Sequence, residues 1–476
     1  MFVRPHHILR VAACLSAACL SASCNTSDAR AQQALENYQV AAAANDLPGA
    51  RRALLELVRA KDDVSEYWVE LGKIQASLGD YGDAYFAFSR AYELNRGNTE
   101  LLSLLTQFAL RSGDIALAKS RAKDLAVLAP NDPWVKLSAG WSAVSESRFD
   151  EANAAADALL ATTPFDPSAT LLKARALIGL HREPEAVELL QRQVQEQPSD
   201  SSSLDLLARA YEHRLDWKNA AAAALKLQQL KPADRETSLL LIRSAFLSGN
   251  EKLGLAASKN VLKPNAEIGL IREVLDLWNS YWTSTERVRE AGKLANAAEG
   301  LDRKLAYAAF LARNGGVAEA INLSAGAATL PVSAETAEAN AVLADAWSRT
   351  PKLADAKRRL DAVIAFDPGN ATALRSRAEL ELRTGNADAA VLDAQKLVTV
   401  LPQSAGDRLL LARSFAAAGK DRWADRTLWA AFQDIPGDEN IFAALAQSRK
   451  GSSEAVQKIR EEFARQRDRK LNQGLL

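Results

Sequence analysis

Apolar residues between 65 and 96 recur with the period of a helix, stop at the polar break GDYGD, and then recur again. The apolar positions are Trp68, Leu71 and Gly72 in the first segment, and Ala84, Phe88 and Ala91 in the second. The small residues Gly72 and Ala84 predict that two antiparallel helices cross closely there. The stretch is therefore predicted to form one helix–turn–helix unit.

The same unit recurs along the chain with a 34-residue period. Alanine marks it at Ala50, Ala84, Ala118, Ala152, Ala186 and Ala220, and again at Ala356, Ala390 and Ala424. Proline marks the end of the second helix at Pro130, Pro164, Pro198 and Pro232, then at Pro368, Pro402 and Pro436, because proline disfavours helix at its own position and the one before. A fixed period of this length predicts a solenoid, in which each unit buries its apolar face on its neighbours.

These patterns resemble the tetratricopeptide repeat family. Residues 65–96 match its W-x2-L-G and A-x3-F signatures, with Gln75 in the usual tyrosine position and Arg96 in the usual proline position. The resemblance implies an all-α, right-handed superhelical solenoid of about twelve helix–turn–helix units. We expect a linker over 24–30, repeat arrays over 31–264 and 301–438, and closing helices over 439–476.

The period slips in the middle of the chain. The spacing from Gly254 to Ala320 falls two positions short of two full periods. The segment 265–300 is a degenerate unit that contains Trp278 and Trp282. Two interpretations remain open: a bend or seam between sub-domains, or a diverged repeat with unchanged packing.

The N-terminus has the features of an export signal. Arg4 and Arg10 provide a basic start, and residues 11–23 are uncharged, small and apolar, and too few to span a membrane. The sequence SASC, ending at Cys24, resembles a bacterial lipobox, although Ser21 stands where leucine or valine is usual. This resemblance implies lipidation of Cys24, attachment to the periplasmic side of the outer membrane, and a signal peptide over 1–23. The alternative is cleavage after Ala31, which gives a soluble periplasmic or secreted protein.

Composition argues against several functions. The chain has 59 basic and 59 acidic residues, which gives no support to nucleic-acid binding. Motifs for phosphate-binding loops, zinc proteases and serine hydrolases are absent from the sequence. His181 and His213 fall in different predicted units without partner cysteines, so neither predicts a metal site. We expect no catalytic residues, no metal and no cofactor, and therefore no enzyme.

The resembled family binds ligands along the first helix of each pair, and its ninth repeat position faces the inner groove. In this chain that position is occupied by Lys73, Gln107, Trp141, Arg175, Arg209 and Arg243, with Trp134 nearby. The arginines would suit carboxylates or phosphates, and the tryptophans would suit peptides or sugar rings. Alternatively, the arginines pair internally with Asp205, Glu212 and Glu236, and the tryptophans are partly buried between helices.

The expected function is a non-enzymatic scaffold that binds other proteins in the bacterial cell envelope. The resemblance is to repeat lipoproteins of exopolysaccharide synthesis and export. The alternatives are an assembly factor for outer-membrane proteins or pili, and direct binding of an anionic polysaccharide.

Overall fold

In the computed structural model, the described residues are 27–449 and 451–473, and they form helices joined by turns. The predicted signal segment 1–23 and Cys24 lie outside the described residues. The first described helix covers 27–43 and includes residues 27–30, which we predicted as a linker. These residues are held in place because the Ser27 hydroxyl donates to the Ala60 carbonyl at 2.9 Å and Asp28 pairs with Lys61 at 3.0 Å.

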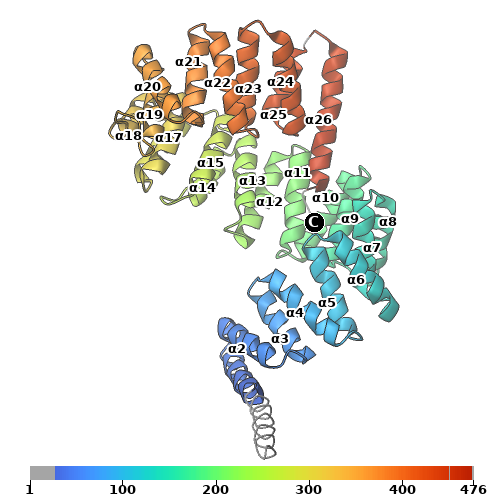
Figure 1. Ribbon diagram of the computed structural model, residues 1–476. Helices are drawn as coiled ribbons and strands as arrows, with labels where there is room; N and C mark the ends of the chain where they lie inside the picture. The colour runs from blue at the N-terminus through green and yellow to red at the C-terminus, as the bar shows by residue number, and fades with distance from the viewer. Residues whose placement is uncertain (1–26, 450, 474–476) are drawn as a thin grey trace, which may run out of the picture. The chain divides into compact units, whose positions relative to one another are not determined.

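After residues 27–43, helices alternate as first and second members of antiparallel pairs (Figure 1). The first members are α3 (Ser65–Ser77), α5 (Thr99–Arg111), α7 (Pro133–Ser145), α9 (Pro167–Gly179), α11 (Ser201–His213), α13 (Arg235–Leu247), α15 (Ile268–Tyr281), α17 (Leu301–Arg313), α19 (Ala337–Trp347), α21 (Ala371–Arg383), α23 (Ala405–Ala417) and α25 (Glu439–Ser448). The second members are α2 (Leu47–Ala60), α4 (Tyr81–Leu94), α6 (Ile115–Leu128), α8 (Phe149–Leu160), α10 (Glu183–Glu196), α12 (Trp217–Leu230), α14 (Glu251–Val261), α16 (Glu286–Ala297), α18 (Val317–Ala325), α20 (Leu353–Phe366), α22 (Ala387–Val400), α24 (Asp421–Asp434) and α26 (Ser453–Gln473). The all-α, paired-helix fold is confirmed, and the predicted closing segment supplies the last pair.

The close crossing predicted at Gly72 is also confirmed. A Cβ atom on Gly72 would lie 2.7 Å from the ring of Phe88, which is closer than real Cβ atoms approach other heavy atoms. Ala84 on the facing helix is fully buried, and Phe88 is 2% exposed. Side chains of this size let α3 and α4 pack with the density that protein interiors require.

Helix starts are set by polar caps that follow the 34-residue period. Side-chain oxygens accept from backbone N–H groups in the first turn at Asn98, Asp132, Asp166, Asp200 and Asp234, one for each of α5, α7, α9, α11 and α13. Each such cap contributes about 1 kcal/mol to helix stability. The caps therefore reinforce the register that the alanine and proline positions indicate.

The chain divides into two compact units, one up to Leu189 and one over Leu190–Leu475. The division falls within α10, outside the range 265–300, for which a seam was one of two open interpretations. Within the second unit, α15 packs on α13 and α17, and α16 packs on α17, whereas α15 and α16 contact each other little. The 34-residue period slips where this pairing is irregular, and a bend at that point stays a prediction.

The tryptophans of this irregular pair belong to the core of the second unit. Trp278 is fully buried and Trp282 is 2% exposed. The indole N–H of Trp278 donates to the Ser258 hydroxyl at 2.9 Å, and the Trp282 ring stacks on Phe246 at 5.1 Å. Trp278 and Trp282 therefore attach α15 to residues of α14 and α13, rather than to the second helix of its own pair.

The last helix brings the end of the second unit back to its beginning. Gln466 on α26 is 2% exposed, and its amide donates to the Phe432 carbonyl at 2.9 Å. Beyond this anchor, α26 contacts α11, and the guanidinium of Arg467 donates to the carbonyl of His213 (Figure 1). The first helices between α11 and α25 are therefore enclosed by an end-to-start contact within this unit.

Candidate functional site

The side chains predicted to line the inner face of the first unit lie in different environments. The Lys73 side chain is 57% exposed, and its ammonium lies 2.7 Å from Glu70. Trp141 is 7% exposed, and the partly buried Trp134 packs against the same apolar cluster. Arg175 is 2% exposed. Lys73 is thus the most solvent-accessible of the four, and ligand binding by this set stays a prediction.

In the second unit, Arg209 and Arg243 make the ion pairs that the sequence left as an alternative. Arg209 Nε lies 3.0 Å from Asp205, and its Nη2 lies 3.0 Å from Glu236. Arg243 pairs with Glu212 on α11. Both arginine side chains keep more than a quarter of their surface exposed, so the pairs leave room for a further contact. Whether they also bind a ligand stays a prediction.

A small hollow of about 90 Å³ forms around these two arginines in the second unit. Its other walls include Tyr281 at the end of α15, Glu439 at the start of α25 and Arg467 on α26. Burial lowers the pKa of the Arg243 guanidinium, against the opposing effects of Tyr281 and Glu439. Burial likewise raises the pKa of Tyr281. The hollow therefore places ionisable groups from five helices in a poorly hydrated corner.

Asp276 is the ninth residue of α15, just as Arg209 and Arg243 are the ninth residues of α11 and α13. We call this series of ninth positions the first-helix column. The Asp276 side chain is accessible to water, yet its pKa is raised because the surrounding helices desolvate it. Arg313 on α17 and Arg375 on α21 act on it through space in the opposite direction. Among the described residues, no cation lies within ion-pair distance of this carboxylate. Asp276 is therefore an exposed carboxylate that several helices desolvate, on the same helix as Tyr281, which lines the hollow.

The walls of the groove beyond Asp276 are held by buried ion pairs. Arg375 binds both carboxylate oxygens of Asp407 at 2.6 and 2.7 Å, and Asp407 is 2% exposed. Asp345 is 1% exposed and lies 3.3 Å from Arg349, which also reaches Glu379 at 2.9 Å. Burial raises the pKa of Asp345, and the neighbouring arginines oppose that shift. Of these pairs, Arg375 and Asp407 carry the charges that act on Asp276. We use the name charged groove for the hollow around Arg209, Arg243 and Tyr281 together with Asp276 and Arg375, which interact through space.

The sequence prediction missed Asp276, Asp345 and Glu379, although all three occupy the ninth position of their first helices. The start of α15 comes one position earlier than the period predicts from α13, and the start of α19 comes two positions later than it predicts from α17. The prediction ended this series of ninth positions at Arg243, where the degenerate unit 265–300 interrupts the period. In the structure, the ninth positions that follow are Asp276, Ala309, Asp345 and Glu379, on α15, α17, α19 and α21. The alanine marks at Ala356 and Ala390 restore the period and would have located Asp345 and Glu379, whereas Asp276 needs the observed start of α15.

Other kinds of site are not seen in the part of the chain that the structure describes. No group of three or more histidine, cysteine, aspartate or glutamate side chains there could hold a metal ion. Within the same residues, no helix combines the length and apolar character needed to cross a membrane. The side chains of the charged groove are of the kinds that form ion pairs and hydrogen bonds.

A comparison with protein families supports the paired-helix fold. A family model for the tetratricopeptide repeat matches residues 35–99, 137–201 and 342–407. Among curated proteins, none matches the chain.

Several solved structures resemble this chain weakly. PilW, titled a widely conserved type IV pilus biogenesis factor, is 19% identical over 41% of this chain and 91% of its own, with a TM-score of 0.35. Naa15/Naa10 bound to HypK-THB is 13% identical over 93% of this chain and 75% of its own, with a TM-score of 0.32. MamA is 18% identical over 36% of this chain and 92% of its own, with a TM-score of 0.30. With TM-scores this low, these matches do not indicate the partners of this chain.

Proposed function

We propose that this chain, a tetratricopeptide repeat protein, is a scaffold whose charged groove holds an extended segment of a partner protein. The observation that carries the proposal is Asp276, which is open to water, desolvated by neighbouring helices and without an ion-pair partner among the described residues. A basic side chain or backbone N–H of a bound segment would satisfy it. The change of sign from Arg243 to Asp276 would orient that segment.

A site-specific crosslink tests the groove. We would replace Tyr281 with p-benzoylphenylalanine in the full chain, irradiate cells that produce it, and identify the crosslinked peptide by mass spectrometry. The same probe at Val40, which is 71% exposed in the first unit, is the control position. We expect a discrete protein adduct at 281 that is absent at 40.

Two charge-removing variants make the test specific. Asp276→Asn keeps the shape of the side chain, and Arg243→Gln keeps its polarity but shortens it, and each is expected to lower the adduct yield at least fivefold. Arg52→Gln removes an exposed arginine from the first unit and should leave the yield unchanged. An adduct pattern that is the same at both probe positions, or that neither groove variant alters, would refute the groove as the binding surface.

We also propose that the protein is exported and lipidated at Cys24. Contacts of the first helix support cleavage before Cys24 over cleavage after Ala31. Ala31 is 5% exposed, and the bonds of Ser27 to Ala60 and of Asp28 to Lys61 would be lost with the shorter product. Labelling with an alkyne fatty acid should therefore mark the wild type and Cys19→Ser, and should fail for Cys24→Ala. Equal labelling of Cys24→Ala would reject lipidation at this residue.

For the pathway, we propose a scaffold in exopolysaccharide synthesis or export, supported by the combination of a lipobox-like sequence with a long repeat array. The crosslinked partner decides this point. Adducts with outer-membrane or pilus assembly proteins would favour the assembly alternative instead. Retention of the purified protein on polygalacturonate, lost in both Arg243→Gln and high salt, would favour direct polysaccharide binding.

A further inference from the structure

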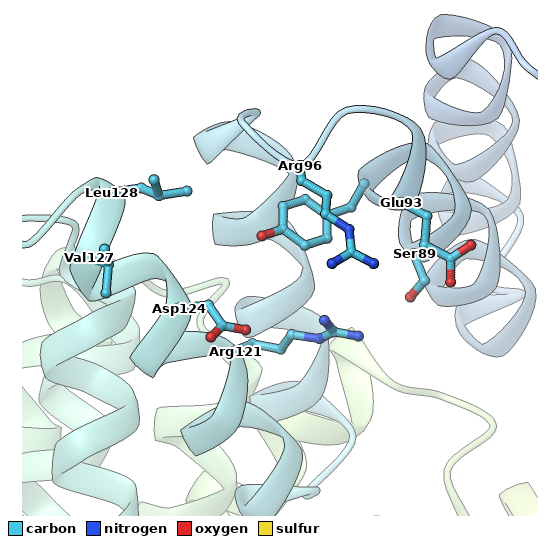
Figure 2. Close-up of a pocket in the computed structure, with 8 residues that line it drawn as sticks. Ser89, Glu93, Arg96, Arg121, Asp124, Val127 and Leu128 are labelled. Carbon is cyan, nitrogen blue, oxygen red and sulfur yellow. The ribbon is translucent and has the colours of Figure 1, made fainter.

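A larger hollow, of about 480 Å³, lies in the first unit between α4 and α6. Both are second helices of their pairs, so this hollow is on the opposite side of the repeats from the first-helix column. Figure 2 shows Arg121 and Asp124 on α6, with Arg96 in the turn after α4. Its volume is in the range of about 300–1,000 Å³ that is usual for ligand pockets.

The arginines of this hollow are not neutralised within the described structure. Arg96 and Arg121 have no described carboxylate within ion-pair distance. Glu93, which also lines the hollow, is paired at 3.0 Å with Arg90, which does not line it. Asp124 is the remaining acidic group on the wall. The wall thus holds two guanidiniums and two carboxylates, and one of these carboxylates, Glu93, already has a cationic partner outside the hollow.

Polar atoms in the wall also lack partners. The Nε of Arg121 and the hydroxyl of Ser89 are shielded from water and have no hydrogen-bond partner. Shielded donors in proteins normally have an acceptor, and their absence here calls for an explanation. Rotation of the Arg121 side chain into the hollow would bring its Nε within reach of an acceptor on a ligand.

Exposed apolar side chains stand beside the arginines at the end of α6. Val127 is 80% exposed and Leu128 is 48% exposed, and both line the hollow. Tyr92 adds a partly buried ring to the same wall. The surface thus combines a forked cation, which suits a carboxylate, with an apolar rim, which suits an aliphatic side chain.

We propose that this hollow is a second protein-docking site, which takes a short partner segment with a carboxylate next to an aliphatic side chain. The guanidiniums of Arg96 and Arg121 would bind the carboxylate. Val127 and Leu128 would cover the aliphatic group. Asp124 disfavours a doubly charged phosphate, and a sugar polymer would leave the apolar rim unused. The site is separate from the charged groove, so each can fail without the other.

Selection from a random peptide library tests the proposal on the full exported chain. Displayed dodecapeptides that bind the wild type are selected, and those that also bind the double variant Arg96→Glu/Arg121→Glu are then removed. We expect the surviving peptides to be enriched in aspartate or glutamate adjacent to leucine, isoleucine or valine. One selected peptide is then synthesised. Compared with its binding to the wild type, it should bind the double variant at least tenfold more weakly and Val127→Ser a few-fold more weakly.

Matched controls separate recognition from folding. Arg52→Glu is the same change at an exposed arginine outside the hollow and should bind like the wild type. Thermal melting checks each variant, and Arg121→Gln serves in place of the double variant if that one melts early. Asp276→Asn should leave peptide binding intact, which distinguishes this site from the charged groove.

Three results would overturn the inference. The first is that no peptide distinguishes the wild type from the charge-reversed chain. The second is a selected motif without an acidic residue. The third is displacement of the winning peptide by inorganic phosphate or polygalacturonate at equal charge concentration, which would make the hollow a general anion site.

Discussion

Removing the carboxylate of Asp407 should loosen the second unit around α21 and α23. Asp407 is 2% exposed and accepts both hydrogen bonds of the Arg375 fork, at 2.6 and 2.7 Å. Alanine at 407 leaves the Arg375 guanidinium, whose side chain is 19% exposed, without this partner. Breaking a buried ion pair in this way costs about 3–5 kcal/mol. Because Asp276 also acts on Arg375, we expect the lower end, about 3 kcal/mol.

Hydrogen exchange followed by mass spectrometry is the suitable assay, because repeat arrays need not unfold as one cooperative unit. A loss of about 3 kcal/mol corresponds to exchange roughly a hundredfold faster in the peptides of α21 and α23. Peptides of the first unit should be unaffected.

Asp388→Ala is the matched control. Asp388 pairs with Lys420 at 2.6 Å, the same distance as the shorter Asp407 contact, but its side chain is 78% exposed. Exposed pairs contribute less than about 1 kcal/mol, so exchange near α22 and α24 should change by less than roughly fivefold. If both variants accelerate exchange equally, burial is not what gives the Arg375–Asp407 pair its importance, and the reasoning fails.

Three further predictions concern packing and pH. Gly72→Ala should destabilise the first unit by about 1 kcal/mol, because overpacking against Phe88 costs about 1–3 kcal/mol and the better helix propensity of alanine offsets about 1 kcal/mol. Phe88→Leu should relieve this overpacking, which a double-mutant cycle measured by urea unfolding would show. Trp278→Phe should cost about 2 kcal/mol through a lost buried hydrogen bond and a cavity, whereas Trp423→Phe, 55% exposed, should leave the thermal midpoint unchanged. The pKa of Asp276 is raised above its ordinary 3.8, so its ionised form opposes folding once the pH exceeds that value. Asp276→Asn should therefore stabilise the second unit at pH 7, and the gain should vanish below about pH 4; a gain that persists in acid would contradict the desolvation argument.

Local chemistry made much of the fold predictable. Gly72 and Ala84 indicated a close helix crossing, and the ring of Phe88 indeed occupies the space that a larger residue would need. The prolines after the second helices marked the helix ends correctly, because their effect on the backbone needs no tertiary partner. The carboxylates that pair with Arg209 and Arg243 were also within reach, since Asp205, Glu212 and Glu236 were the candidates that the sequence offered.

The charged groove needed information that a fixed period does not carry. Asp276 enters the column only when α15 is seen to begin one position early relative to α13, a shift that Trp278 and Trp282 accommodate by packing in the core. The sequence therefore could not show where the groove changes sign.

By itself, the sequence determined the repeating unit, its length and the small or capping residues at its joints, because these depend on neighbours a few positions away. Only the tertiary structure decided which of the candidate ion pairs form and which distant segments meet. Arg243 pairs across repeats with Glu212, and Arg467 reaches the carbonyl of His213 from 254 positions away. Such contacts depend on the sum of small rotations between successive repeats, and one irregular pair changes that sum for every repeat that follows it.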